Sequence, residues 1–402
     1  MIIYYLKKLL HMLKNILFVL LMFVFVKATA QQGYSVTGIV TDEKDKPLPG
    51  ATVFLGDSRK ATASDSEGKF VLSEVRPGNY NLVVKMIGFV VTTQAFVLQN
   101  KNMRFRVKLQ EDNLMLKTVN ISGLKKADRQ EYLDIFIKSF LGRSYNAAQC
   151  KILNTDDINI WLDKKNDVLY ANSEEFLIIE NKALGYRMKY LLNEFSCEQP
   201  YSYGGTIRYT GNLFFEDLAG NFRQQKRWEQ ERINSYLGSV QHFFRSMFSN
   251  TLEENGFVTY VIPNPSALNN MVKKNLNLIY KHLQPVRSFT RYISEIDSSY
   301  KTFNLGLMMK DSTELYALYK LNSEPKDFLA RGRVIQRNFK MPSGQLSILR
   351  PKLDSIVISK YGDINPVNGV MLVGFMGWGQ MAGVLPSDYT LPPGTVLPVS
   401  KK

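Results

Sequence analysis

The stretch from Tyr34 to Phe89 constrains the fold most, because short alternating runs in it are separated by turn signals. Residues 34–41 (YSVTGIVT) and 80–86 (YNLVVKM) place apolar side chains with a period of about two, which is typical of half-buried β-strands. Gly and Pro recur between such runs, in residues 45–50, 65–68 and 76–78. The pattern predicts several short strands in an all-β sandwich, and no catalytic constellation lies within it.

The expected core of this sandwich consists of inward-facing apolar residues from its strands. These are Val36, Val40, Val53, Phe70, Tyr80, Leu82 and Val84. We also expect Gly50 and Gly78 to adopt positive φ in their turns.

Ordered motifs in this stretch carry a resemblance to a known family. They are Gly38-x-Val40-x-Asp42, residues 47–53 (PLPGATV), Thr62-x-Ser64-Asp65-x-x-Gly68-x-Phe70, Pro77-Gly78-x-Tyr80-x-Leu82-x-Val84 and residues 87–89 (IGF). Together they resemble the carboxypeptidase-regulatory-like domain, and residues 113–122 are similar to the strand that leads out of it. The resemblance implies a prealbumin-like β-sandwich (Ig/prealbumin-like) that accompanies carboxypeptidases or TonB-dependent outer-membrane transporters as an accessory. About 280 residues follow, which is too few for a 22-stranded transporter barrel.

The first 30 residues read as a signal peptide. Lys7, Lys8 and Lys14 form a basic n-region, residues 16–26 are an unbroken apolar run of 11, and residues 28–30 (ATA) fit a cleavage site before Gln31. The alternative is a membrane anchor, but the run is shorter than the ~20 residues that a spanning helix needs. We therefore expect an exported protein, in the periplasm or associated with the outer membrane.

The formal net charge of +15 becomes +11 once the signal segment is removed. Such a balance fits anionic lipid, polysaccharide or nucleic acid as a partner, or simple solubility. Export argues against nucleic acid, and the dispersed basic residues favour solubility. Cys150 and Cys197 are the two cysteines, and either a disulfide in an oxidising compartment or two buried thiols is consistent with them.

The pattern changes near residues 122–126, which predicts a boundary between a sandwich at 31–122 and an α+β domain at 123–402. Helical spacing over 125–143 ends at Gly142, and a long helical pattern over 222–248 is divided at Gly238. Strands are predicted at 158–162, 176–180, 186–192, 206–215, 257–262, 287–296, 302–308, 313–321, 332–339 and 355–360.

The helical pattern over 222–248 also holds the candidate interaction surface. Its residues are Arg223, Arg227, Trp228 and Arg232. A basic and aromatic face of this kind fits a membrane or glycan, whereas interleaved acids favour a core helix with a solvated side. Three segments of this region, 181–186 (NKALGY), 226–229 (KRWE) and Leu385-Pro386-x-Asp388-Tyr389, resemble the poorly characterised second domain of exported bacterial proteins that carry the same N-terminal module. That resemblance supplies no catalytic residues.

Motifs for cofactor or metal chemistry are incomplete. Residues 377–382 (GWGQMA) fit G-x-G-x-x-G/A, but prolines and the end of the sequence leave no room for a nucleotide-binding unit. His242 and His282 remain after signal cleavage, and neither lies in a zinc motif. We predict no catalytic, cofactor-binding or metal residues, and a non-catalytic role in binding or assembly with an envelope protein or glycan. The alternative is a periplasmic hydrolase acting on peptide or glycan through carboxylates of the second domain.

Overall fold

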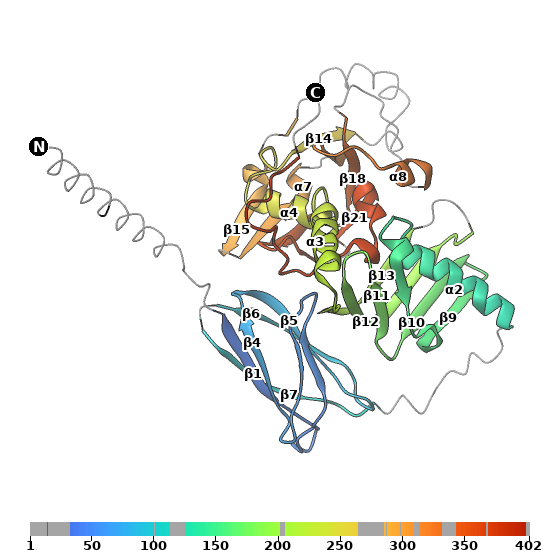
Figure 1. Ribbon diagram of the computed structural model, residues 1–402, viewed down its shortest axis with the longest axis vertical. Coiled ribbons are helices and arrows are strands. Elements are labelled where there is room, and N and C mark those ends of the chain that lie inside the picture. Colours follow the sequence, from blue (N-terminus) through green and yellow to red (C-terminus); the bar gives the residue numbers. More distant parts are fainter. Residues whose placement is uncertain are drawn as a thin grey trace, which may run out of the picture.

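The computed structural model describes Lys14 and residues 33–99, 101–112, 125–201, 206–263, 285–286, 288–297, 299–308, 313–331, 343–366 and 369–398. An N-terminal β-sandwich is followed by a mixed α+β region with several sheets (Figure 1). Apart from Lys14, the predicted signal segment lies outside the described residues, as do the predicted boundary at 122–124 and the predicted strand at 332–339.

The sandwich consists of a three-stranded sheet, ordered β4-β1-β7, and a four-stranded sheet, ordered β3-β2-β5-β6. Strands β1 and β7 run parallel, and the other pairs are antiparallel. The strands are β1 (Tyr34–Thr41), β2 (Thr52–Leu55), β3 (Ala61–Ala63), β4 (Lys69–Val75), β5 (Gly78–Lys85), β6 (Thr92–Leu98) and β7 (Met103–Lys108).

The predicted core of the sandwich is confirmed. Val36, Val40, Val53, Phe70, Leu82 and Val84 are buried in one cluster, and Tyr80 packs against it. Gly50 has the expected positive φ of 79°, but Gly78 does not lie in that region. Gly78 is required for a different reason, which involves the second part of the chain.

The first sheet of the α+β region has the order β8-β11-β12-β10-β9, and β13 pairs along the other side of the long strand β12. Helix α2 (Lys126–Phe140) contacts β9, β10 and β13 and covers one face of this sheet. The strands predicted at 158–162, 176–180 and 206–215 are confirmed with shifts of one or two residues, whereas the strand predicted at 186–192 continues to Glu198. Strands β8 and β10 were not predicted. The strands are β8 (Cys150–Ile152), β9 (Ile158–Asp163), β10 (Val168–Ser173), β11 (Leu177–Asn181), β12 (Tyr186–Glu198) and β13 (Ile207–Asp217).

The long helical pattern forms two helices, α3 (Phe222–Tyr236) and α4 (Val240–Phe248). Gly238, at a φ of 79°, separates them as predicted, and the Ser239 side chain accepts from the backbone N–H of His242 at the start of α4. His242 is buried between aromatic rings, and burial lowers its pKa to about 4. It is therefore a packed, neutral core histidine.

Two four-stranded sheets complete the α+β region, ordered β14-β17-β18-β21 and β15-β16-β19-β20. The predicted strands at 287–296 and 302–308 are too long, because 290–292 forms a 3₁₀ turn and 305–308 a short helix, α7 (Leu305–Met308). The remaining elements are β14 (Phe257–Pro263), β15 (Ile293–Asp297), β16 (Tyr300–Asn304), β17 (Thr313–Tyr319), α8 (Lys326–Arg331), β18 (Gln345–Pro351), β19 (Ser355–Ser359), β20 (Ile364–Asn365), β21 (Val370–Gly374) and α9 (Phe375–Trp378).

The disulfide that the sequence left open is not formed. Cys150 of β8 lies opposite Asn181 of β11, and Asn181 lies opposite Tyr186 at the start of β12. Cys197 lies near the other end of β12, and both cysteines are free. Eleven residues of strand separate those two β12 positions, a span on the order of 30 Å. A disulfide requires Cα atoms within about 7 Å, so the fold keeps these two thiols apart.

Candidate functional site

The sandwich and the α+β region are joined by the loop between β2 and β3, residues 56–60, which we call the joint loop. The Asp57 N–H donates to the carbonyl of Leu213 on β13 at 2.7 Å, and the Asp57 carbonyl accepts from the Ser387 N–H at 2.7 Å. Ser58 forms a parallel bridge with Phe214, and its carbonyl accepts from the Phe215 N–H at 2.9 Å. The joint loop therefore continues the backbone pairing of the first α+β sheet.

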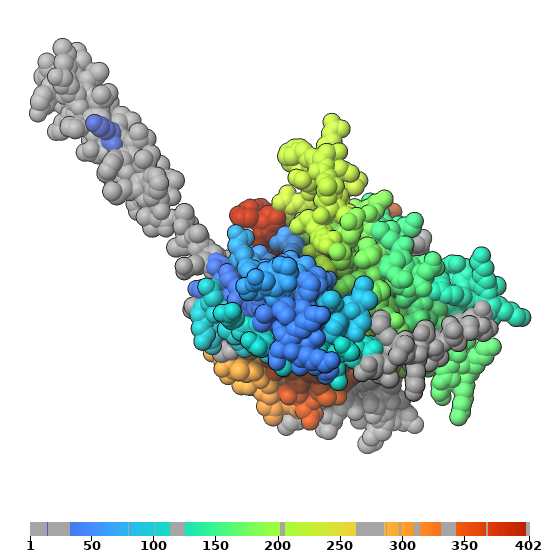
Figure 2. All heavy atoms as spheres, turned by 90° about the horizontal axis from the view of Figure 1, so that it is seen from below, coloured from blue at the N-terminus to red at the C-terminus, as the bar shows by residue number. Residues whose placement is uncertain are grey.

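Buried aromatic rings beneath the joint loop add packing to the contact between the sandwich and the first α+β sheet. Phe54 of β2 is fully buried, and its ring lies 4.6 Å from that of Phe214 and 5.8 Å from that of Phe176. The Lys85 ammonium, 8% exposed, donates to the Glu174 carbonyl at 2.7 Å. Figure 2 shows the blue sandwich pressed against the green first sheet and the red C-terminal segment.

A second contact connects β5 to the turn between β19 and β20. The Tyr361 hydroxyl donates to the Pro77 carbonyl at 2.7 Å. A β-carbon added to Gly78 would lie 2.6 Å from the Tyr361 ring, so only glycine fits here without displacing that ring.

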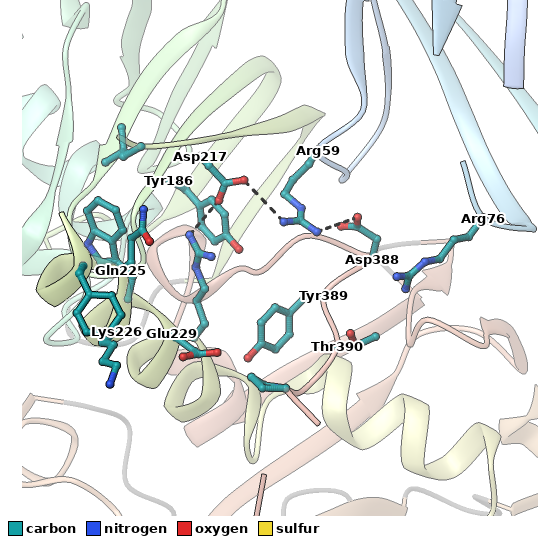
Figure 3. Close-up of a pocket in the computed structure, with 15 residues that line it drawn as sticks. Arg59, Arg76, Tyr186, Asp217, Gln225, Lys226, Glu229, Asp388, Tyr389 and Thr390 are labelled. Carbon is teal, nitrogen blue, oxygen red and sulfur yellow. Dashed lines mark hydrogen bonds and ion pairs between the residues drawn. The ribbon is translucent and has the colours of Figure 1, made fainter. Parts of the chain in front are cut away.

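Between these contacts lies a pocket of about 530 Å³, which both parts of the chain line. Figure 3 shows Arg59 and Arg76 entering from the sandwich, Gln225, Lys226 and Glu229 from α3, and Asp388 to Thr390 from the C-terminal segment. The lining residues combine cations, acids and aromatic rings. They are Arg59, Arg76, Tyr186, Asp217, Leu218, Phe222, Gln225, Lys226, Trp228, Glu229, Arg232, Asp388, Tyr389, Thr390 and Pro392.

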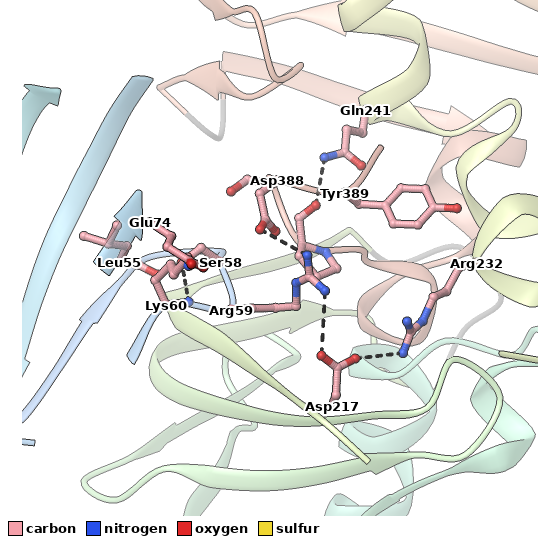
Figure 4. A network of polar contacts seen from close by, with 12 residues as sticks. Leu55, Ser58, Arg59, Lys60, Glu74, Asp217, Arg232, Gln241, Asp388 and Tyr389 are labelled. Carbon is pink, nitrogen blue, oxygen red and sulfur yellow. Dashed lines mark hydrogen bonds and ion pairs between the residues drawn. The ribbon is translucent and has the colours of Figure 1, made fainter. Parts of the chain in front are cut away.

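Two arginines of the pocket are held by carboxylates from the α+β region (Figure 4). Arg59 pairs with Asp388 at 3.3 Å and with Asp217 at 3.7 Å, and Asp217 also accepts from Arg232 at 3.1 Å. The Arg232 guanidinium lies 3.9 Å from the centre of the Tyr186 ring. By contrast, within the described part of the chain neither Arg76 nor Lys226 pairs with a carboxylate. These two cations therefore remain available to a ligand.

Trp228 forms the wall of the pocket on α3. Its indole N–H donates to the Lys182 carbonyl at 2.9 Å. Its ring lies where a β-carbon of Gly185 or Gly220 would stand, at 2.2 and 2.4 Å. The two glycines therefore permit the close packing of helix α3 against the first sheet.

Arg245 of α4 fixes the loops that face the sandwich. Its Nε donates to the Tyr361 carbonyl at 2.7 Å, one Nη donates to the Tyr389 carbonyl at 2.6 Å, and the other donates to the Ser387 carbonyl at 2.7 Å. One guanidinium thus holds both the β19–β20 turn and the C-terminal segment of the pocket.

Two acids near the joint, Asp57 of the joint loop and Asp363 of the β19–β20 turn, have raised pKa values. Although both keep exposed surface, the surrounding protein raises the pKa of Asp57 to about 7, and the Asp363 charge raises it further. Burial also raises the pKa of Asp363, although the Ser359 hydroxyl donates to its carboxylate at 3.0 Å. The Tyr389 pKa rises to about 12 through burial, and within the described residues its hydroxyl has no hydrogen-bond partner.

The structure places two of the four residues of the predicted interaction surface in the pocket and two outside it. Trp228 and Arg232 line the pocket, whereas Arg223 and Arg227 are exposed on α3 outside it. Sequence reasoning missed Arg59, Arg76 and the acids that pair with Arg59, because no local pattern marks a contact between distant segments. The signal lay in the three segments of the second resemblance, which contribute Tyr186, Lys226, Trp228, Glu229, Asp388 and Tyr389 to this one pocket.

No group of three or more His, Cys, Asp and Glu side chains in the described part of the chain is placed to hold a metal ion. Among the same residues, no helix has the length and apolar character that crossing a membrane requires.

Comparison with known families identifies the N-terminal module. Residues 36–121 match the CarboxypepD_reg-like domain, so the β-sandwich belongs to that family, and the rest of the chain has no assigned family. No curated protein matches the chain.

Solved structures with partial similarity have low scores. The minor pilin of Streptococcus agalactiae is 15% identical over 20% of this chain and 46% of its own, with a TM-score of 0.19. Catechol 1,2-dioxygenase of Pseudomonas arvilla is 12% identical over 22% and 55%, with a TM-score of 0.18. A cohesin–X-dockerin complex of Acetivibrio cellulolyticus is 16% identical over 28% and 78%, with a TM-score of 0.20. The matches span about half of the pilin and the dioxygenase, and similarities this low carry no argument about function.

Proposed function

We propose that this chain is an exported, non-catalytic protein of the cell envelope, which binds a partner protein in the pocket at the joint. The observation that carries the proposal is the shared lining of the pocket, since Arg59 and Arg76 come from the sandwich and the other lining residues come from the α+β region. A site built from both parts gives the CarboxypepD_reg-like module a role beyond that of a spacer.

Export rests on the sequence of residues 1–30, and association with the outer membrane rests on the family resemblance. N-terminal sequencing of protein recovered from the native envelope tests this part. We expect the mature chain to begin at or near Gln31, and an intact Met1 would contradict export with cleavage.

The chemistry of the pocket favours a polypeptide segment as the ligand. The rings of Phe222 and Tyr389 offer apolar contact, while Gln225 and Thr390 offer hydrogen bonds beside Arg76 and Lys226. In most ligand sites, apolar and aromatic side chains supply the contact area and a few polar groups fix the orientation of the ligand. This pocket combines both kinds of side chain.

Site-specific photocrosslinking tests the location. A photoreactive amino acid at Gln225, which lines the pocket, should capture an envelope protein, whereas the same group at exposed Gln230 of α3 should not. Charge reversal supplies the matched control. Arg76→Glu with Lys226→Glu should abolish capture, and Arg223→Glu with Arg227→Glu should leave it intact. Equal capture from both crosslinking positions would contradict a binding site in the pocket.

A hydrolase remains the second candidate because the pKa values of Asp57 and Asp363, two acids near the joint, are both raised, and acids with raised pKa values occur in acid–base catalysis. Turnover of a peptide or glycan that Asp363→Asn abolishes, with folding preserved, would favour this candidate over the binding protein.

A further inference from the structure

The outer face of the first α+β sheet carries a row of side chains in register across four strands. Trp161 of β9 stands opposite Tyr170 of β10, Tyr170 opposite Ser196 of β12, and Ser196 opposite Arg208 of β13. The next row along, Leu162, Leu169 and Cys197, points the other way into the core beneath α2. The Trp161 row therefore lies on the face that α2 does not cover.

Trp161 and Tyr170 form a stacked pair on this face. Their ring centres are 5.6 Å apart and their planes differ by 19°. Both rings are half-buried, and neither belongs to any of the three hydrophobic clusters of the described residues. In the described sheet β9 is the edge strand, so the Trp161 ring face turned away from Tyr170 is directed beyond the sheet edge.

Polar side chains that can form hydrogen bonds surround the stacked pair. The Asn159 amide donates to the Asn172 side-chain oxygen at 3.0 Å, directly beside the rings on the same face. Beyond them, Arg208 pairs with Glu198 at 2.5 Å. Within the described residues these two amides form no other side-chain hydrogen bond, so they keep donors and acceptors for a ligand, while the nearby guanidinium is already paired with Glu198.

We propose that the Trp161 ring and the Asn159–Asn172 amides form a binding site for a neutral carbohydrate. A sugar ring presents apolar C–H groups on one face, which pack against an aromatic ring, and hydroxyl groups at its edge, which match carboxamides. Pairing of Arg208 with Glu198 leaves no strong single-sign charge for a polyanion. Two rings also supply too little apolar area for a stable protein interface, which buries ~1,000 Å² or more.

This site is separate from the pocket at the joint. The other end of the same sheet face is covered by the sandwich through Phe214 and Phe54. The joint loop pairs with β13, whereas the Trp161 pair lies on β9 and β10. The inference therefore goes beyond the proposed function and can fail without it.

Binding of the full mature chain to immobilised neutral oligomers of glucose, xylose, mannose and N-acetylglucosamine tests the site, with titration of any that bind. We expect Trp161→Ala to weaken the affinity at least tenfold, Trp161→Phe to retain part of it, and Asn159→Ala to weaken it less. Tyr145→Ala and Tyr201→Ala are the matched controls, because both tyrosines are exposed elsewhere, at 62% and 57%. They should bind as the unmodified chain does.

Thermal unfolding of each variant separates recognition from sheet stability. Cross-strand aromatic pairs also stabilise sheets, so a lower Tm for Trp161→Ala with no binding by the unmodified chain would overturn the proposal. Binding of charged polysaccharides alone, or neutral-glycan binding that Trp161→Ala leaves unchanged, would overturn it equally.

Discussion

Gly78 of the sandwich lies directly against the Tyr361 ring of the α+β region, with no room for a β-carbon between them. In Gly78→Ala the new methyl group would displace the ring and break the 2.7 Å hydrogen bond from the Tyr361 hydroxyl to Pro77. We expect a loss of about 1–2 kcal/mol, because close packing and one hydrogen bond are lost together.

Amide hydrogen exchange shows which part of the chain loses stability in Gly78→Ala. Exchange in residues 56–60 should accelerate in Gly78→Ala, while the sandwich core around Val40 and Val53 keeps its protection. Gly56→Ala is the control, since its β-carbon would meet Asn81 at an ordinary 3.6 Å. Unfolding of the sandwich itself in Gly78→Ala would contradict a role confined to the joint.

Arg245→Met should be the most destabilising change near the pocket. It would leave the carbonyls of Tyr361, Ser387 and Tyr389 without their charged donor, at a cost of about 3 kcal/mol or more. Urea denaturation measures the difference. Arg227→Met, at an exposed position on the neighbouring helix, should change stability by less than about 0.5 kcal/mol. Similar losses in both variants would show that the three contacts contribute little.

Local patterns predicted the parts of the fold that local physics determines. The period of two in β1 and β5 correctly predicted residues of the sandwich core, and Gly238 correctly predicted the break between α3 and α4. Strand β10 was missed because its polar end, Asn172 and Ser173, weakens the alternating pattern. The pocket could not be predicted in this way, since Arg59 and Asp388 meet through tertiary packing and nothing near either residue encodes the partner.

The two cysteines should behave as unbridged thiols. Burial raises the Cys150 pKa to about 12, and Cys197 is 5% exposed, so alkylation of the native protein at pH 8 should be slow. Unfolding without reductant should then expose two thiols that iodoacetamide modifies, and reductant should not change the unfolding midpoint. Recovery of a linked pair of peptides that contain Cys150 and Cys197 would contradict the structure.

The joint should weaken as the pH rises from about 4 to about 7. Folding raises the Asp57 pKa from 3.8 to about 7, so the folded state favours the protonated acid. The stabilising contribution is complete below the unfolded pKa and is lost as the pH passes the folded value. Solvent at the exposed side of Asp57 will reduce the size of this effect, but not its direction.

Asp57→Asn isolates this titration, because asparagine is neutral at every pH and accepts the positive φ of 57° at this position. The variant should match the unmodified chain near pH 4 and become increasingly more stable than it towards pH 7, as measured by Tm. Asp363→Asn should shift the profile to lower pH, because it removes a negative charge that raises the Asp57 pKa, so that Asp57 ionises more easily. Parallel Tm profiles for Asp57→Asn and the unmodified chain from pH 4 to pH 7 would show that Asp57 does not titrate in this range.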